Sequence, residues 1–256
     1  MGSKNKLKKF RDNYLFDNVI QPDRNVLISD KFQYKGKWKT KFFKNNNEIV
    51  LELGCGKGEY TIYLSQRFPN KNFIGIDIKG ARIWRGAKTA RDKKIQNVVF
   101  LRTEIELIKN IFENNEVSEI WITFPDPQIK FKKSKHRLIN PNFLSKYNDV
   151  LIDKGLINVK TDSEFLFGYL HGILEKMECK INFANHDIYQ NLNAPEGITN
   201  IQTFYENKFL EIQPNDMDTY NQEKKWIGVD FKGHIIYGSS LKEIRHIIDY
   251  PKLHNQ

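Results

Sequence analysis

Short apolar runs alternate with longer amphipathic stretches between residues 49 and 177. The runs are rich in β-branched and aromatic residues, which predicts strands at residues 49–53, 72–77, 98–102, 119–123 and 156–160. The stretches between them predict helices at residues 60–68, 83–93, 105–114, 141–151 and 163–177. Such alternation is typical of βαβ units, in which the strands run parallel. The pattern therefore predicts an α/β fold with a doubly wound, mostly parallel sheet.

The N-terminal part of the chain has a different pattern. Residues 1–30 lack a sustained apolar period and predict a basic arm with a little local structure, with a disordered tail as the alternative. From Lys35 to Lys41, lysine recurs at every second position around Trp38. In an extended segment this spacing puts the ammonium groups on one face, where they suit a polyanion.

The C-terminal part contains further candidate elements. Residues 180–188 and 226–231 are strand candidates, and residues 197–209 predict a loop with a short helix. Ser240 and Glu243 form a capping box before an apolar stripe, which predicts a last helix. The chain thus divides into a basic N-terminal arm (1–45), a central α/β domain (46–231) and a C-terminal extension with a capped helix (232–256).

The composition is that of an ordinary globular protein, with 39% hydrophobic and 28% charged residues. No stretch approaches the roughly 18 to 20 apolar residues of a membrane span, and the first residues lack the apolar region of a signal peptide. We therefore expect a cytoplasmic protein without a membrane partner. Cys55 and Cys179 cannot build a disulfide framework, and no metal-ligand spacing is present, so no metal is expected.

The positive charge is concentrated near the N-terminus. The whole chain carries a formal charge of +10 and has a pI near 9.3. Residues 1–48 hold twelve Lys or Arg against five acidic residues, a net +7 of that +10. A basic surface of this kind indicates a polyanionic partner such as nucleic acid.

A glycine-rich loop follows the first strand of the α/β domain. Residues 52–58 read Glu-Leu-Gly-Cys-Gly-Lys-Gly, which puts Gly54, Gly56 and Gly58 between a strand and a helix. Glycines there let a ligand approach the backbone closely. The spacing G-x-G-x-G, with the acid Glu52 at the strand end, differs from the G-x-G-x-x-G of a dinucleotide site. It favours a ligand without a pyrophosphate, such as S-adenosylmethionine, which needs acceptors for its ammonium group and ribose.

Two further acids follow the next strands. Asp77 ends the second strand, where a Rossmann-type site places its ribose-binding acid, and its alternative is a helix N-cap. Glu104, two residues past the third strand, is a candidate acceptor for an adenine amino group, or else an ordinary helix N-terminal charge. Cys55 is either a nucleophile or, as we favour, a small residue packed in a tight loop.

An acid stands between two prolines after the fourth strand, in the sequence Phe124-Pro125-Asp126-Pro127. Each proline restricts the backbone, so Asp126 is held rigidly at the carboxyl end of the sheet, where α/β proteins bind ligands. A surface turn explains the prolines alone. It does not explain the basic residues that follow, which indicate phosphate binding: Lys130, Lys132, Lys133, Lys135 and Arg137.

These motifs together resemble the bacterial tRNA (guanine-N7-)-methyltransferases. That family has Glu-Leu-Gly-x-Gly-x-Gly, Phe-Pro-Asp-Pro followed by Lys, Lys-Thr-Asp and Thr-x-Tyr-Glu, and this chain has all of them in order between residues 49 and 209. It departs from the family in having Gln128 where Trp is common, and in its altered basic run. The resemblance implies a Rossmann-like fold of the class I methyltransferase type.

The resemblance also implies an activity and its residues. The activity is methyl transfer from S-adenosylmethionine, which becomes S-adenosylhomocysteine, to guanine N7 in tRNA, at nucleotide 46 of the variable loop. Asp126 is then the key active-site residue, and the cofactor contacts are Glu52, Gly54, Gly56, Gly58, Asp77, Glu104 and Asp126. The contacts to the tRNA guanosine are Lys130, Asp162, Thr203, Phe204, Tyr205 and Glu206. Both a monomer and a homodimer fit the sequence.

Guanine N7 carries a lone pair, so its methylation needs no general base and depends on positioning. We expect Asp126 to accept hydrogen bonds from the guanine edge as the ring gains positive charge. The rival interpretations are a methyltransferase of another RNA base, an RNA-binding module without catalysis, and a nicotinamide-dependent oxidoreductase. The segment after the fourth strand speaks against amino-group methylation, and the glycine spacing speaks against the oxidoreductase.

Overall fold

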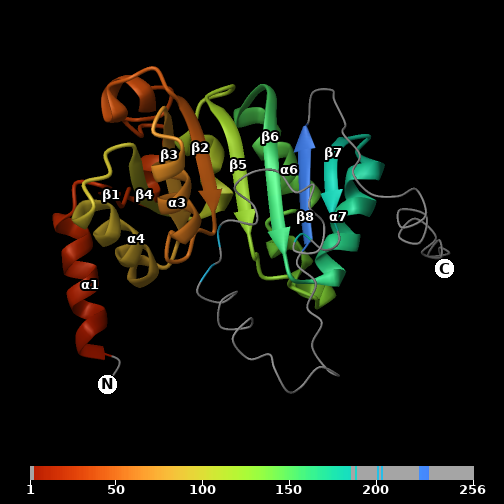
Figure 1. The fold of residues 1–256 in the computed structure, drawn as a ribbon, viewed down its shortest axis with the longest axis horizontal. Helices are drawn as coiled ribbons and strands as arrows, with labels where there is room; N and C mark the ends of the chain where they lie inside the picture. Colours follow the sequence, from red (N-terminus) through yellow and green to blue (C-terminus); the bar gives the residue numbers. More distant parts are fainter. Residues whose placement is uncertain (1–2, 186–187, 189–200, 202, 204–224, 231–256) are drawn as a thin grey trace.

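The computed structural model describes residues 3–185, 188, 201, 203 and 225–230. Helices cover both faces of one sheet, whose strands are β1 (Val19–Ile20), β2 (Glu48–Leu53), β3 (Lys71–Asp77), β4 (Val98–Arg102), β5 (Val117–Thr123), β6 (Leu151–Thr161), β7 (Lys180–Asn185) and β8 (Lys225–Asp230) (Figure 1). The α-helices are α1 (Ser3–Leu15), α2 (Arg24–Ile28), α3 (Glu59–Arg67), α4 (Gly80–Asp92), α5 (Ile108–Ile111), α6 (Pro141–Val150) and α7 (Glu164–Lys176). Shorter helical turns are η1 (Trp38–Phe43), η2 (Ile105–Leu107) and η3 (Phe131–His136).

The strand order in this sheet is β1-β4-β3-β2-β5-β6-β8-β7. Strand β8 is antiparallel to both β6 and β7, whereas every other pair is parallel. From β2 the chain moves outward through β3 and β4, and it then returns to the other side of β2 to form β5 and β6. This reversal between β2 and β5 is the topological switch point, where ligands bind in doubly wound sheets. The predicted doubly wound, mostly parallel sheet is confirmed.

Two hydrophobic cores lie on the two faces of the sheet. Alternate residues of β2 point into different cores: Ile49 and Leu51 belong to one core, and Val50 belongs to the other. Helices α5, α6 and α7 cover the first core, and α3 and α4 cover the second. The parallel strands are buried on both sides, which explains why their sequences read as continuous apolar runs.

The two largest differences between predicted and observed boundaries concern one helix and one strand. The helix expected at residues 105–114 is a 3₁₀ turn followed by the short α5, and the chain is already extended at Phe112. The carboxylate of Glu116 accepts the backbone N–H of Glu113 at 2.9 Å, so this turn closes on a side chain rather than on another helical turn. Strand β6 begins earlier than expected, at Leu151, because that residue pairs with Val117 of β5.

The N-terminal residues 3–15 form a docked helix, so the alternative of a disordered tail is wrong there, and the segment has more regular structure than the little that was expected. Helix α1 packs on α4. The Asn13 side chain donates to the Gly80 carbonyl at 2.8 Å, and the Trp84 indole donates to Asp12 at 2.8 Å. These contacts depend on residues far along the chain, which local periodicity does not show.

The lysine-rich segment around Trp38 is also different from the prediction, since it is not extended. It folds into a turn and the π-helical segment η1. Trp38 is fully buried, stacks on Phe112 and donates its indole N–H to the Ile111 carbonyl at 3.1 Å. Burial of this aromatic ring decides the conformation, so the lysines do not line one face of an extended segment.

Several predictions fall outside the described residues. These are the C-terminal extension with its capped helix at residues 232–256, Phe231, and most of residues 197–209. The strand candidates at 180–188 and 226–231 are confirmed over residues 180–185 and 226–230, as β7 and β8, whereas Ile188 lies in a turn. Within the described part of the chain, no helix combines the length and apolar character that crossing a membrane requires.

Candidate functional site

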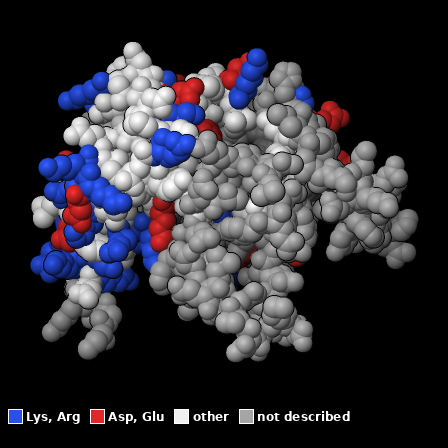
Figure 2. Space-filling view, viewed as in Figure 1, with Lys and Arg blue, Asp and Glu red and all other residues white. Residues whose placement is uncertain are grey.

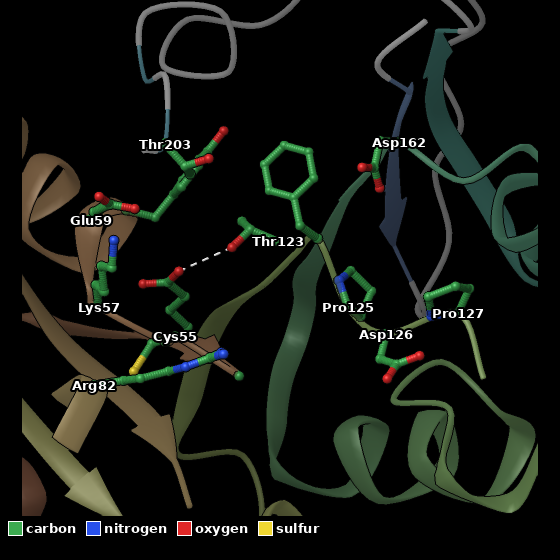
Figure 3. A pocket seen from close by; sticks show the side chains of 15 residues that line it. Cys55, Lys57, Glu59, Arg82, Thr123, Pro125, Asp126, Pro127, Asp162 and Thr203 are labelled. Atoms are coloured by element: carbon green, nitrogen blue, oxygen red, sulfur yellow. Dashed lines mark hydrogen bonds between the residues drawn. The ribbon is translucent and has the colours of Figure 1, made fainter. Parts of the chain in front are cut away.

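A cavity opens at the carboxyl ends of β2 and β5, at the topological switch point. Its volume is about 310 Å³. Figure 3 shows its lining, with Lys57, Glu59 and Thr203 on one side and Asp126, Pro127 and Asp162 on the other. The remaining lining residues are Glu52, Gly54, Cys55, Gly56, Tyr60, Arg82, Thr123, Phe124 and Pro125. The glycine loop and the Phe-Pro-Asp-Pro segment, which are far apart in the sequence, therefore meet here.

The glycine loop bends under the cavity in a conformation that suits glycine. Gly54, Gly56 and Gly58 have φ angles of 74°, 55° and 70°, in the left-handed region. The backbone N–H of Gly54 donates to the Ile76 carbonyl at 2.8 Å, and that of Gly56 donates to Asp77 at 2.9 Å. The loop is thereby attached to the end of β3.

The three glycines differ in what they border. Gly54 and Gly56 line the cavity. Gly58 lies outside it and is the N-cap residue of α3, where an added Cβ would lie 2.4 Å from Cε1 of Phe100. The structure therefore gives Gly58 a packing role, which a motif spacing does not distinguish from ligand contact.

Glu52 is a buried carboxylate at the base of the cavity. It accepts hydrogen bonds from the backbone and hydroxyl of Thr61, with 2.8 Å to the backbone nitrogen, and from the Thr123 hydroxyl at 3.0 Å (Figure 3). Burial raises the pKa of Glu52 from 4.5 to about 7, and the hydrogen bonds from Thr61 and Thr123 oppose this rise. A nearby cation would be strongly favoured by this desolvated carboxylate.

A second cavity of about 380 Å³ borders the first and shares Gly54 with it. Asp77 and Glu104 line it from the ends of β3 and β4. Both oxygens of Asp77 accept backbone N–H groups, Oδ2 from Gly56 at 2.9 Å and Oδ1 from Lys79 at 2.7 Å. Lys79 is itself the N-cap residue of α4, so the alternative of Asp77 as that cap is wrong. Glu104 is half-buried and pairs with Arg24 at 3.3 Å.

Asp126 occupies an exposed position at the edge of the first cavity. The backbone is left-handed at Phe124 and Gln128, with φ angles of 48° and 44°, so the two prolines lie between strained residues. The carboxylate of Asp126 accepts the backbone N–H of Gln128 at 3.0 Å. This hydrogen bond orients the carboxylate at the edge of the cavity.

The basic run after Asp126 has two kinds of members. Lys130, Lys132, Lys133 and Lys135 are exposed. Arg137 is buried, at 6% exposure, and its guanidinium donates to the carbonyls of Pro127 and Gln128 at 3.1 Å each. The structure thus assigns Arg137 to holding the loop, in contrast to the expectation that it binds phosphate. Lys130 precedes η3 and lies outside both cavities.

The Lys-Thr-Asp motif contains one residue with a predicted role, Asp162, and one without, Lys160. Asp162, at the end of β6, is exposed and lines the first cavity. Lys160 is fully buried behind it, and its ammonium donates to the Tyr60 hydroxyl at 2.7 Å and to the Ile201 carbonyl at 3.3 Å. The sequence marked Lys160 only as a member of a motif that matches the family, without indicating its buried position or its hydrogen bonds.

Some residues of the site belong to no recognisable sequence motif, and some predicted site residues lie outside the part of the chain that the structure describes. Thr61 and Thr123, which hold Glu52, and Arg82, which lines the cavity from α4, have no motif that marks them. Thr203 is buried and lines the cavity. Phe204, Tyr205 and Glu206 are outside the described residues.

The paired cavities fit a nucleoside that carries a cation and no phosphate. Their strand-end acids are Glu52, Asp77 and Glu104, which accept hydrogen bonds, and the loop amides of Gly54 and Gly56 already bond to the end of β3. A pyrophosphate would need free loop amides and would be repelled by these acids. Within the described residues, no group of His, Cys, Asp and Glu is arranged to hold a metal ion.

Comparison with known proteins gives consistent results. A family model described as a putative methyltransferase matches residues 46–236. A tRNA (guanine-N(7)-)-methyltransferase of Christiangramia forsetii is 60% identical over 82% of this chain and 94% of its own length. One of Bacteroides fragilis is 45% identical over 81% of each chain.

The fold is shared with more distant proteins. A solved antibiotic-related methyltransferase superimposes with a TM-score of 0.53 at 17% identity, over 77% of this chain and 92% of that one. This similarity concerns the fold, whereas the sequence matches concern the family. Because relatives at 60% and 45% identity span about four fifths of its length, the chain belongs to the tRNA (guanine-N(7)-)-methyltransferase family.

Proposed function

We propose that this protein transfers a methyl group from S-adenosylmethionine to N7 of a guanosine in tRNA, at nucleotide 46 of the variable loop. The observation that carries the proposal is the meeting of motif residues from distant segments around one cavity: Glu52, Asp126, Asp162 and Thr203. Residues 46–231 form the methyltransferase domain in this proposal, in line with the match at residues 46–236. A tRNA substrate suits a cytoplasmic enzyme.

The two cavities suit the two halves of the cofactor. Glu52, Gly54 and Gly56 line the first, and the buried carboxylate of Glu52 would offset the charge of the methionine ammonium group. Asp77 and Glu104 line the second, where their free lone pairs would accept from the ribose hydroxyls and the adenine amino group. Gly54, common to both cavities, lies where the halves meet.

When bound, S-adenosylmethionine supplies a methyl group on a positively charged sulfur, which keeps the electrons of the broken C–S bond. The lone pair of guanine N7 forms the new bond, so no side chain has to remove a proton first. Asp126 would orient the guanine by accepting hydrogen bonds from its edge, with its carboxylate already fixed by the Gln128 N–H. Its negative charge would also stabilise the positive charge that develops on the ring.

The guanosine itself would be held from the other strands. Asp162 follows β6 and Thr203 approaches from a later segment, and both border the same cavity as Asp126. Lys130 is close in sequence and exposed, which suits a phosphate next to the guanosine rather than the base. Phe204, Tyr205 and Glu206 follow Thr203 directly and are assigned to the guanosine by resemblance to the family.

A basic surface beside the cavity suits the rest of the tRNA. Figure 2 shows Lys and Arg gathered over the region of α1 and α4, to the left of the grey atoms. Arg82 joins this surface to the cavity, since it is exposed on α4 and lines the pocket. The other exposed or half-exposed bases of these two helices are Lys6, Lys8, Lys9, Arg11, Arg85, Lys88 and Arg91. The docked helix α1 would thus bind phosphates from a fixed position.

The test is methylation of unmodified tRNA with labelled cofactor, followed by identification of the modified nucleoside. Wild-type protein is expected to form 7-methylguanosine and to bind the cofactor in calorimetry, and Asp126→Asn is expected to lose turnover while its unfolding behaviour stays that of the wild type. Asp153→Asn is the matched control. It changes an exposed acid near the start of β6, whereas the cavity lies at the end of this strand. Another modified base would refute guanine N7 as the target. Binding of RNA without any cofactor binding would favour an RNA-binding module instead.

A further inference from the structure

The turn that follows Asp126 presents an aromatic side chain to solvent. Phe131 is 89% exposed, the highest value among the large hydrophobic residues in the described part of the chain, and Ile129 nearby is 66% exposed. Phe131 begins η3, shortly after Pro127, which lines the first cavity. Exposing a phenylalanine to this extent forgoes the favourable free energy of removing its ring from water. A partner that covers the ring would recover this free energy.

This turn is held in place from behind by Arg137. Its guanidinium donates to the carbonyls of Pro127, Gln128 and Ile129, at 3.1, 3.1 and 3.4 Å. The same guanidinium lies over the rings of two residues of α7, 4.8 Å from the centroid of Phe165 and 4.4 Å from that of Tyr169. The backbone between the active-site acid and η3 is thus attached to a core helix.

A second set of bonds closes η3 itself. The N–H of Lys133 donates to the Lys130 carbonyl at 2.8 Å, and the Asn140 side chain donates to the Lys135 carbonyl at 2.8 Å. Phe131 is consequently carried on a turn that is folded before any partner arrives. Its partner does not have to supply the free energy for ordering the turn.

The charges around Phe131 indicate which partner fits. Lys130 and Lys132 flank it, and Lys133 and Lys135 follow, all of them exposed. None of these four side chains makes an ion pair with an acidic residue in the structurally described part of the protein. An apolar protein surface would leave this charge without a counterpart. A nucleic acid supplies both a base for the ring and phosphates for the ammonium groups.

We propose that Phe131 stacks on an unpaired base next to the methylated guanosine, while Lys130 and Lys132 bind the phosphates on either side. The proposal rests on the proposed function only in taking RNA as the substrate. Because the turn begins at the wall of the cavity, a ring on this turn meets a neighbouring nucleotide rather than the target itself. Stacking there would stabilise the strand in the unstacked form that the reaction requires.

The experiment uses the full-length protein and unmodified tRNA in which 2-aminopurine replaces a nucleotide beside the target guanosine. Stacking on Phe131 predicts a fluorescence change on binding that Phe131→Ala removes and Phe131→Trp retains. Phe131→Ala should weaken tRNA binding about 5- to 100-fold, as expected for the loss of one stacked base. Ile28→Ala, which removes a 53% exposed apolar side chain from α2, is the matched control and should bind as wild type does.

Binding and fluorescence are measured without cofactor, so the result does not depend on turnover. If 7-methylguanosine forms and Phe131→Ala binds tRNA like the wild type, the stacking proposal is wrong and the proposed function stands. If no methylation is found but Phe131→Ala still loses affinity and the fluorescence change, the stacking proposal stands alone. If Phe131→Ala instead dissociates a dimer in sedimentation and leaves tRNA binding intact, the partner is a second copy and the proposal is refuted. Wild-type unfolding behaviour of Phe131→Ala confirms that the fold is unchanged.

Discussion

Replacing Glu52 by glutamine tests how strongly burial perturbs the carboxylate at the base of the cavity. The carboxylate is 4% exposed and accepts hydrogen bonds from Thr61 and Thr123. A glutamine has the same shape, and its carbonyl oxygen can accept from Thr61 while its amide donates to the Thr123 hydroxyl. The substitution therefore removes the titration of this residue and keeps its packing.

The magnitude follows from the raised pKa. A change from 4.5 to about 7 corresponds to about 3 kcal/mol in the free energy of unfolding. Between these pH values the folded protein keeps the Glu52 proton, while the unfolded chain has released it. The contribution of Glu52 to stability is thus fully present below pH 4.5 and is lost as the pH rises to about 7. The amide of the Glu52→Gln variant does not titrate, so the stability of this variant relative to wild type should rise by about 3 kcal/mol across this window.

The assay is urea unfolding of wild type and Glu52→Gln without cofactor, at several pH values from about 4.5 to 8. Glu48→Gln, which removes an exposed carboxylate from the same strand, is the matched control and should differ from wild type by less than about 1 kcal/mol throughout. A difference between Glu52→Gln and wild type that stays constant to within about 0.5 kcal/mol over this range would refute the raised pKa.

Three further predictions concern packing and RNA binding. In urea unfolding, Gly58→Ala should lower the free energy of unfolding by about 2 kcal/mol, because the added Cβ would lie 2.4 Å from Phe100. The control Gly168→Ala, on α7, adds a Cβ that meets no atom within 4 Å and should be neutral or stabilising. Trp38→Ala should cost about 3 to 5 kcal/mol in urea unfolding, as for other buried aromatic residues, and leave the turnover of the folded protein unchanged since Trp38 lies outside both cavities. The affinity for tRNA should fall steeply with salt, and Arg85→Ala should reduce the slope of log Kd against log salt by about one, whereas a flat response would contradict phosphate binding.

The regular elements of the sheet were predictable from the sequence, for a local reason. Strands buried on both faces are continuous apolar runs, and the predictions at residues 49–53 and 98–102 agree closely with β2 and β4. The glycine loop and the Phe-Pro-Asp-Pro segment were recognisable because their backbone restrictions belong to the residue types themselves. Both also occupy strand ends, which a parallel sheet brings to the same edge.

Contacts between residues far apart in the sequence determined the features that the sequence pattern did not predict. The lysine-rich segment around Trp38 is helical because the Trp38 ring is buried against Phe112. Helix α1 is ordered because it packs on α4. Arg137 looked like one more phosphate ligand, yet its guanidinium binds three carbonyls and two rings. A side chain's residue type determines which bonds it can form. The fold determines which partners are within reach, and so only the tertiary structure distinguishes the arginine that holds the turn from the lysines that remain exposed on it.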